Sequence, residues 1–443
     1  MPSMKMYCIV CREQYDPQRD AGQIITIDDE KHYVCRRDWP GFNAGAALQK
    51  QMMEAMGEAP RAGESPEAAK RRAEAEKRLA EFQLNPRQIV TALDAYVIGQ
   101  DRAKREVAVA VYDHHRIHQG LIGKEGGDVD LEKSNILLVG PSGSGKTLIA
   151  RTLARSLGVP FAAADVTSLS PTGYTGNDVE SVLTALYIDA GEDNEWAARG
   201  VVFLDEIDKI ARKSTANPSI TRDVSGESVQ HALLKLVEGT NAQLPLGASG
   251  RKHPDAPPDY IDTTNILFIG GGAFEGFPEV VAKKMHRPTS RMMGLRASKE
   301  DIVGDPQRDY QILAEAPQEI LIEAMIEYGF VPEFAGRFPV VVPLAPLTKG
   351  EMRRALTEPK NAVVKQQIEL FRRDGIELVV PDETLDAIIE KAVGMKTGVR
   401  ALRSLTKQVT SRARYDLSGE RGISRVTIPP AALSDPAKYE VVR

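Results

Sequence analysis

The sequence lacks any long apolar run. No uncharged apolar stretch of the 443-residue chain approaches the roughly 18 to 20 residues that a membrane-spanning helix needs. The first residues, MPSMKMYCIVCREQYD, turn polar at once and have no apolar core of the kind that a secretory signal carries. From these absences we expect neither membrane insertion nor secretion, and we predict a cytoplasmic protein.

An excess of basic charge is also missing. The chain has 57 Lys and Arg residues against 62 Asp and Glu residues, which gives a net charge of −5. Proteins that hold nucleic acid non-specifically do so mainly through a field of Lys and Arg side chains. The charge balance therefore argues against a general nucleic-acid-binding protein.

Cysteine is scarce, and its placement is uneven. The sequence has three cysteines, all of them within the first 35 residues. An odd number gathered at one end of a large chain does not predict a disulfide framework. The pattern fits a reducing compartment, with either a metal or free thiols at the N-terminus.

Composition divides the chain into four parts. Residues 1–45 hold the cysteines and short alternating runs, which predict a small β-rich module. Residues 46–85 form a charged linker, in which 67–81 carries nine charges in fifteen residues. In residues 86–345, apolar runs of four to six residues alternate with helical periodicity, which predicts an α/β domain. Residues 346–443 are predicted to form a mostly helical domain.

Periodicity also predicts individual elements in the last two parts. The expected strands are 135–140, 201–205 and 265–270, and the expected helices are 87–96, 100–118, 146–157, 178–190, 228–238, 349–371 and 381–393.

A phosphate-binding motif follows the first expected strand. The sequence GPSGSGKT matches G-x-x-x-x-G-K-[ST] between an apolar run and an amphipathic helix, the context that this motif requires. Its glycines let backbone N–H groups turn toward a polyphosphate, and the helix N-terminus adds positive potential. Lys146 would reach the β and γ phosphates, and Thr147 would ligate Mg²⁺. The candidate nucleotide-binding residues here are Gly140, Pro141, Ser142, Gly143, Ser144, Gly145, Lys146, Thr147 and Leu148.

A pair of carboxylates ends the second expected strand. Four apolar residues run directly into Asp205 and Glu206, about 60 residues after the phosphate motif. Asp205 would hold Mg²⁺ through water, and Glu206 would polarise the water that attacks the γ phosphate. The two motifs together predict an ATP hydrolase.

Several longer motifs give the sequence a specific resemblance. In chain order they are YVIGQ at 96–100, the phosphate motif, GYTG at 173–176, FLDEIDK at 203–209, NPSITRDVSGE at 217–227, RKH at 251–253, PEFAGR at 332–337 and GVR at 398–400. Over residues 86–403 the chain resembles the ClpX family of AAA+ unfoldases, which feed the ClpP peptidase. The resemblance implies an α/β AAA+ domain with a parallel sheet, a helical small domain, a ring hexamer, and tagged or unfolded proteins as substrates.

The resemblance also implies roles for residues outside the phosphate site. Val97 and Ile98 would pack on adenine, Arg337 would be the arginine finger that reaches a neighbouring subunit, and Arg400 would be the sensor-2 arginine. The substrate-gripping pore loop would be Gly173, Tyr174, Thr175 and Gly176, with a second pore loop at 213–227 and a basic entrance at Arg251, Lys252 and His253.

The N-terminal module departs from the family pattern of two C-x-x-C pairs. The first pair, Cys8 and Cys11, is intact, but the second reads Cys35 followed by Asp38. A Zn²⁺ site needs four ligands, and an Asp oxygen can supply one of them. The candidate metal ligands are therefore Cys8, Cys11, Cys35 and Asp38, with His32 as a substitute for the fourth; a module without metal is the alternative.

The segment at the ClpP-docking position departs as well. Met293, Gly294 and Leu295 stand where the family has an apolar residue, Gly and Phe, so the aromatic ring is replaced by a smaller apolar group. This leaves two functional alternatives to the unfoldase that serves ClpP. One is a remodelling chaperone that works without a peptidase, and the other, of a different class, is a zinc-finger ATPase that acts on nucleic acid.

Overall fold

The computed structural model describes most of the chain from Asn85 onward. The residues described there are 85–118, 133–170, 177–211, 224–244, 260–285, 305–395, 399–420 and 422–443. Before Asn85 it describes the backbone of four short strands. The chain divides into two compact units, residues 1–77 and 78–443.

The N-terminal unit contains two antiparallel strand pairs. Its strands are β1 (Met6–Tyr7), β2 (Gln14–Tyr15), β3 (Gly22–Ile27) and β4 (Glu30–Cys35). β1 pairs with β2, and β3 pairs with β4 in a register that sets Gly22 opposite Cys35. The strands agree with the β-rich character predicted for residues 1–45.

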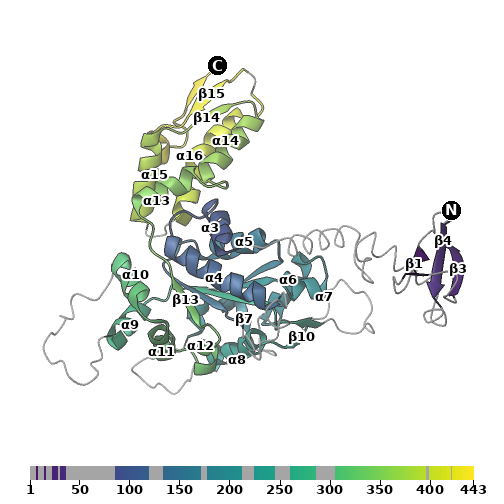
Figure 1. The fold of residues 1–443 in the computed structure, drawn as a ribbon. Helices are drawn as coiled ribbons and strands as arrows, with labels where there is room; N and C mark the ends of the chain where they lie inside the picture. Colours follow the sequence, from purple (N-terminus) through teal and green to yellow (C-terminus); the bar gives the residue numbers. More distant parts are fainter. Residues whose placement is uncertain are drawn as a thin grey trace. The chain divides into compact units, whose positions relative to one another are not determined.

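A five-stranded parallel sheet forms the centre of the second unit (Figure 1). Its strand order is β13-β5-β12-β9-β6, and every neighbouring pair is parallel. The strands are β5 (Ile136–Val139), β6 (Phe161–Asp165), β9 (Val201–Asp205), β12 (Leu267–Gly272) and β13 (Val340–Pro343). Parallel strands need crossover connections, and here these contain helices, which confirms the α/β prediction.

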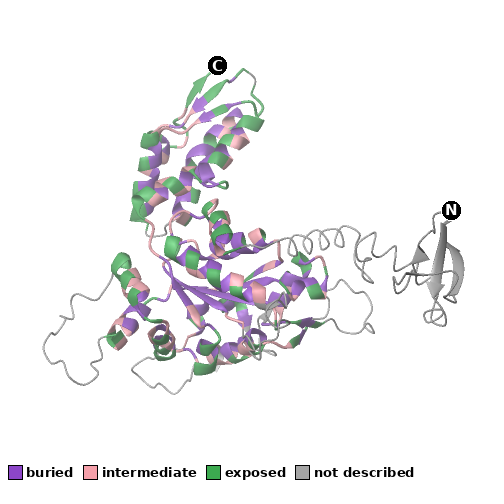
Figure 2. Ribbon diagram, viewed as in Figure 1, coloured by how far each residue is buried: buried purple, intermediate pink, exposed green. Residues whose placement is uncertain are grey.

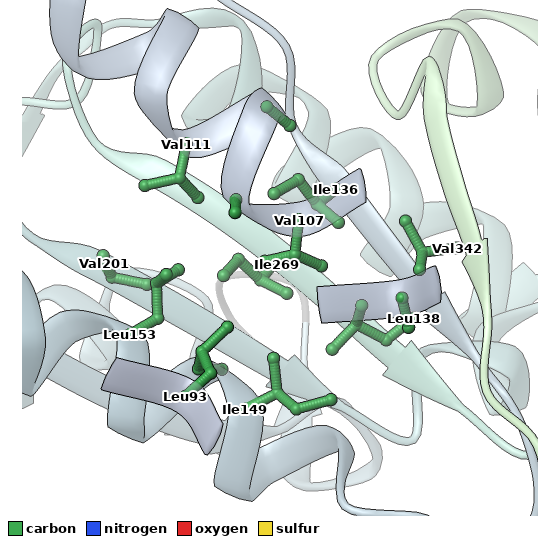
Figure 3. Packing of buried hydrophobic residues seen from close by; sticks show 14 of the residues in the cluster. Leu93, Val107, Val111, Ile136, Leu138, Ile149, Leu153, Val201, Ile269 and Val342 are labelled. Atoms are coloured by element: carbon green, nitrogen blue, oxygen red, sulfur yellow. The ribbon is translucent and has the colours of Figure 1, made fainter. Parts of the chain in front are cut away.

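Helices cover the sheet and bury the apolar strands. Figure 3 shows Leu93 of α3 (Pro86–Asp94), Val107 of α4 (Asp101–His118) and Ile149 of α5 (Lys146–Leu157) packed against the strands. On the sheet side of this cluster lie Ile136, Leu138, Val201, Ile269 and Val342. β5 and β12 are buried along their whole length, as expected for strands covered on both faces.

The remaining elements of this part complete the layers around the sheet. They are β7 (Leu169–Ser170), β8 (Asn177–Asp178), α6 (Ser181–Asp189), α7 (Asn194–Ala197), a 3₁₀ turn at Ile207–Ile210, α8 (Val224–Glu238), β10 (Asn241–Gln243), β11 (Tyr260–Asp262), α9 (Phe277–Met285), α10 (Pro306–Glu315), α11 (Gln318–Tyr328) and α12 (Pro332–Gly336). The helices predicted at 178–190 and 228–238 are present as α6 and α8 with shifted starts.

The C-terminal part has its own hydrophobic core (Figure 2). It consists of α13 (Lys349–Thr357), α14 (Val363–Arg373), α15 (Asp382–Gly394) and α16 (Val399–Leu417), with a small sheet of β14 (Glu377–Val379), β15 (Arg425–Thr427) and β16 (Glu440–Val442). The helical stretch predicted at 349–371 is present, but as two helices rather than one. Pro359 lacks a backbone N–H and interrupts it, so that α13 ends at Thr357 and α14 starts at Val363.

Candidate nucleotide-binding site

A cavity of about 600 Å³ lies between the carboxyl end of the sheet and the C-terminal helices. Ligands of open α/β sheets bind at this end of the strands. The cavity is lined by Tyr96, Val97, Ile98, Ser142, Gly143, Ser144, Gly145, Lys146, Thr147, Leu148, Asp205, Glu206, Asp208, Lys209, Gly272, Ala273, Leu347, Ala355, Pro359, Asn361, Val363, Val399, Arg400 and Arg403. The lining residues come from segments as far apart in the sequence as Tyr96 and Arg403.

The phosphate motif forms the turn between β5 and α5. Gly143 and Gly145 have φ angles of +80° and +103°, which residues with a side chain rarely adopt. Gly140 is needed for a different reason, because a Cβ there would lie 2.8 Å from the carbonyl oxygen of Leu344. These glycines let the loop bend back over the first turn of α5, where backbone N–H groups have no partner within the helix.

The ammonium group of Lys146 is held at the mouth of this loop. Its Nζ donates to the carbonyl oxygens of Gly140 at 2.7 Å and Pro141 at 3.1 Å. Burial lowers the pKa of Lys146, and Arg400 adds to this effect, whereas the carboxylates of Asp205, Asp208 and Glu206 oppose it. Gly140 and Pro141 thus orient the lysine, although neither of them lines the cavity.

The two residues expected to hold Mg²⁺ are in contact. Thr147 Oγ1 donates to Asp205 Oδ2 at 3.3 Å, which joins the start of α5 to the end of β9. A hydroxyl and a carboxylate are oxygen ligands that suit Mg²⁺. The next residue, Glu206, is exposed and has a φ of +57°, and its N–H donates to Asp205 Oδ1 at 3.0 Å. Glu206 thus follows the buried strand as an exposed residue of the cavity lining.

Asp208 is a residue of the site that the sequence analysis did not single out. Its side chain is only 2% exposed, and Oδ1 accepts no hydrogen bond from the described residues. It lies beside Gly272 at the end of β12, where a Cβ would approach Oδ1 to 2.4 Å and the Phe274 ring to 2.8 Å. Asp208 is part of the FLDEIDK motif, so the sequence offered it as a candidate. Its proximity to Gly272 becomes evident only in the folded chain.

This close approach predicts the effect of Gly272→Ala. The added methyl group must displace a buried carboxylate or a buried ring, and overpacking of this kind costs about 1 to 3 kcal/mol. We expect calorimetry to show a melting temperature lower by roughly 2 to 12 °C, because each kcal/mol shifts the melting temperature of a large domain by about 2 to 4 °C. Gly394→Ala is the control, since a Cβ there meets nothing within 4 Å. Equal melting temperatures for the two variants would contradict the packing described.

The rest of the cavity lining includes apolar groups and two arginines. Val97 and Ile98 face it from the segment before α4, and Leu347 and Val363 come from the C-terminal part. Flat apolar surfaces of this kind suit a purine ring. Arg400, which was predicted from the sequence, and Arg403, which was not, both extend from the first turns of α16. They place positive charge beside a loop built for phosphate.

Arg337 lies away from this cavity, at the C-terminal end of α12. Asn135 anchors its backbone by donating from Nδ2 to the Arg337 carbonyl oxygen at 2.9 Å. The guanidinium is half exposed, and its Nη2 donates to Glu238 Oε1 at 2.8 Å. The structure therefore does not bring Arg337 to its own chain's cavity, and the side chain is presented at the surface.

Other residues singled out in the sequence lie outside the described residues. These are Cys8, Cys11 and Asp38 of the metal candidates, Gly173 to Gly176, most of 213–227, Arg251 to His253, and Met293 to Leu295. Cys35 and His32 fall in β4, of which the backbone is described. No cluster of three or more metal-ligating side chains occurs among the residues described. No helix in that part of the chain is long and apolar enough to cross a membrane.

Comparison with known proteins agrees with this geometry. The family model for the AAA domain (Cdc48 subfamily) matches residues 131–341, which span the phosphate loop, the acidic strand end and Arg337. The chain is therefore an AAA+ ATPase.

More specific matches cover most of the chain. The ATP-dependent Clp protease ATP-binding subunit ClpX of Bacteroides thetaiotaomicron is 46% identical over 336 residues, 76% of this chain and 78% of that protein. The subunits of the same name from two strains of Bacteroides fragilis are 45% identical over 76% of this chain and 77% of their own length. The chain belongs to the ClpX family.

Proposed function

We propose that this chain is an ATP-dependent protein unfoldase that acts as a ring hexamer and threads substrates to the ClpP peptidase. The observation that carries the proposal is the cavity. It combines a phosphate loop, an acidic pair and two arginines from the C-terminal helices, in a chain of the ClpX family. Because the α/β domain and the helical domain both contribute residues to this site, ATP turnover there can move the two domains relative to each other.

Each residue of the site has a separate role in this proposal. Lys146 and the loop N–H groups bind the phosphates of ATP, and Val97 and Ile98 hold the base. Thr147 and Asp205 would hold Mg²⁺, which supplies charge neutralisation on the phosphate oxygens when bound. The Glu206 carboxylate accepts a hydrogen bond from the attacking water and so orients and polarises it. Arg400 connects the helical domain, residues 346–443, to the nucleotide.

A trans role for Arg337 follows from its position. The side chain is exposed and lies outside its own cavity, where it contributes nothing to its own site. In a ring, a surface arginine can enter the site of the next subunit and stabilise charge on the phosphoryl group. This requirement for a neighbour is the reason we propose a hexamer rather than an active monomer.

Tyr174 is proposed to grip the substrate. The described strands β7 and β8 lie on either side of residues 171–176 and pair in parallel, Leu169 with Asn177 and Ser170 with Asp178. The residues that flank the segment are thus paired with each other. An aromatic side chain between two glycines can bind many polypeptide sequences through apolar contacts.

We expect Tyr174→Ala to hydrolyse ATP at a near-normal rate but to unfold a tagged fluorescent protein at least roughly tenfold more slowly. The expected loss corresponds to an apolar contact of about 1.5 kcal/mol or more. Tyr415→Ala is the matched control, because Tyr415 is 79% exposed on α16, remote from the pore segment in sequence. Equal unfolding per ATP in wild type and Tyr174→Ala would argue against the gripping role.

Met293, Gly294 and Leu295 are proposed to dock ClpP. Leu fills less of an apolar cleft than Phe does, which weakens the free energy of docking by roughly 1 to 2 kcal/mol per loop. Several loops on one ring can bind together, and this avidity offsets the loss. We expect detectable docking that Leu295→Phe strengthens and that Gly294→Trp abolishes. The assay is ClpP peptide cleavage against ring concentration. If deletion of the loop leaves docking unchanged, the docking role of these residues is wrong. If the wild-type ring never docks ClpP, the chaperone without a peptidase becomes the better account.

The proposed N-terminal zinc site and the cytoplasmic location rest on the sequence alone. The proposed ligands are Cys8, Cys11, Cys35 and Asp38. Zinc content of the purified chain is the direct check on this site. The net charge of −5 does not favour the nucleic-acid-binding alternative, which a salt-dependent DNA titration would reveal.

A further inference from the structure

A buried glutamine joins the phosphate loop to the connection between the two parts of the site. The Gln100 side-chain Nε2 donates to the carbonyl oxygens of Ser144 at 3.2 Å and Ala345 at 2.8 Å. Its Oε1 accepts from the N–H of Ala345 at 3.0 Å. The residue is only 8% exposed, so that both ends of its carboxamide are satisfied inside the protein.

The backbone around Gln100 is held in an uncommon conformation that aims this side chain. Gly99 and Gln100 have φ angles of +66° and +61° in succession, and the second is unfavourable for a residue with a Cβ. The carbonyl of Gln100 accepts from Lys104 N–H at 2.8 Å, which starts α4 immediately afterwards. Local strain of this kind persists only where surrounding contacts determine the conformation.

The two partners of the carboxamide belong to different functional segments. Ser144 lies in the phosphate loop, directly before the glycine that caps α5. Ala345 follows β13 and begins the connection to α13. The segment that precedes Gln100 also contacts the helical domain directly, since the Lys360 N–H donates to the Ala95 carbonyl oxygen at 3.0 Å.

We propose that Gln100 is a positioning residue of the ATP site. A trans peptide directs its C=O and the following N–H to opposite sides. The bond to the Ser144 carbonyl therefore turns the Gly145 N–H away from Gln100, toward the phosphate-binding face of the loop. The bonds to Ala345 tie this peptide to the start of the helical domain, so that the loop and the connection keep one arrangement. The inference rests on the proposed nucleotide site and adds a residue to it.

Gln100→Glu tests the proposal with the smallest change of shape. A carboxylate cannot donate, and it would face two carbonyl oxygens. Loss of one charge-assisted contact to phosphate typically weakens binding about 10- to 100-fold. We expect the dissociation constant of a fluorescent ADP analogue to rise at least tenfold. The ATP concentration for half-maximal hydrolysis should rise in parallel while the maximal rate changes less than about threefold, because the contact is made equally before and during the reaction.

Gln318→Glu is the matched control. The Gln318 carboxamide pairs with a backbone in the same way, since Nε2 donates to the Val341 carbonyl at 2.9 Å and Oε1 accepts from the Val341 N–H at 3.0 Å. Gln318 contacts β13, the strand that precedes Ala345, but it does not line the cavity. We expect it to lower thermal stability without changing ADP affinity by more than about threefold.

The outcomes separate the inference from the site on which it rests. If Lys146→Ala binds the ADP analogue as wild type does, the nucleotide site itself is wrong. If Lys146→Ala loses binding but Gln100→Glu retains wild-type affinity, or if Gln318→Glu weakens binding equally, the positioning role is overturned. Should Gln100→Glu not fold, the uncharged Gln100→Met decides in the same assay, and at least a threefold weaker affinity supports the proposal, whereas wild-type affinity overturns it.

Discussion

Glu206→Gln is expected to bind ATP with nearly wild-type affinity and to hydrolyse it about 10² to 10⁴ times more slowly. The glutamine keeps the size of the side chain but removes the carboxylate that orients the attacking water. Binding should survive, because Glu206 is exposed at the rim of the cavity and makes none of the loop contacts that hold the phosphates. ATP affinity by equilibrium titration and turnover by phosphate release measure the two effects separately.

Lys146→Ala provides the contrast to this variant. The lysine meets phosphate charge in the bound state, so its removal should abolish binding and hydrolysis together. Loss of a general base slows a reaction by at least about 10². A Glu206→Gln protein that hydrolyses ATP at more than about a tenth of the wild-type rate would therefore contradict the assignment of Glu206.

Arg337→Ala should reduce hydrolysis by about 10³ to 10⁵ while leaving ATP binding intact, the range found for arginine fingers. The expectation follows from the position of the guanidinium, which is outside its own cavity and at the surface. Arg425→Ala is the matched control, because Arg425 also forms a half-exposed ion pair, with Glu377 at 2.8 Å, and has no proposed role in hydrolysis. Loss of a surface ion pair alone costs about 1 kcal/mol or less.

Mixing experiments test whether Arg337 acts on a neighbour. A mixture of Arg337→Ala and Glu206→Gln chains contains interfaces at which an intact Arg337 meets an intact Glu206. Such mixtures should therefore recover part of the hydrolysis that both pure variants lack. A wild-type protein that is a fully active monomer by light scattering would rule out this account of Arg337.

The sequence predicted the middle of the sheet better than its edges. The expected strands correspond to β5, β9 and β12, which are the three inner strands and read as continuous apolar runs. The edge strands β6 and β13 were not predicted. β6 is FAAAD, which is rich in Ala and has weak strand propensity, and β13 is VVVP, whose proline is tolerated at an edge position.

The candidate site divides along a similar line. The phosphate loop and Glu206 could be found from sequence because their chemistry lies in consecutive residues. Asp208 and Gln100 could not be assigned roles in this way, because each depends on a partner more than 40 residues away, Gly272 for Asp208 and Ala345 for Gln100. Arg403 needed the position of α16 relative to the loop, which periodicity does not give.

Degradation of a folded, tagged fluorescent protein tests the central claim most directly. The wild-type chain, ClpP and ATP are mixed with the substrate, and fluorescence and peptide products are followed together. We predict loss of fluorescence with peptide release that requires both ATP and ClpP, and neither with Glu206→Gln. Rapid ATP hydrolysis by the wild-type chain with stable fluorescence and no peptide products would contradict an unfoldase that serves ClpP.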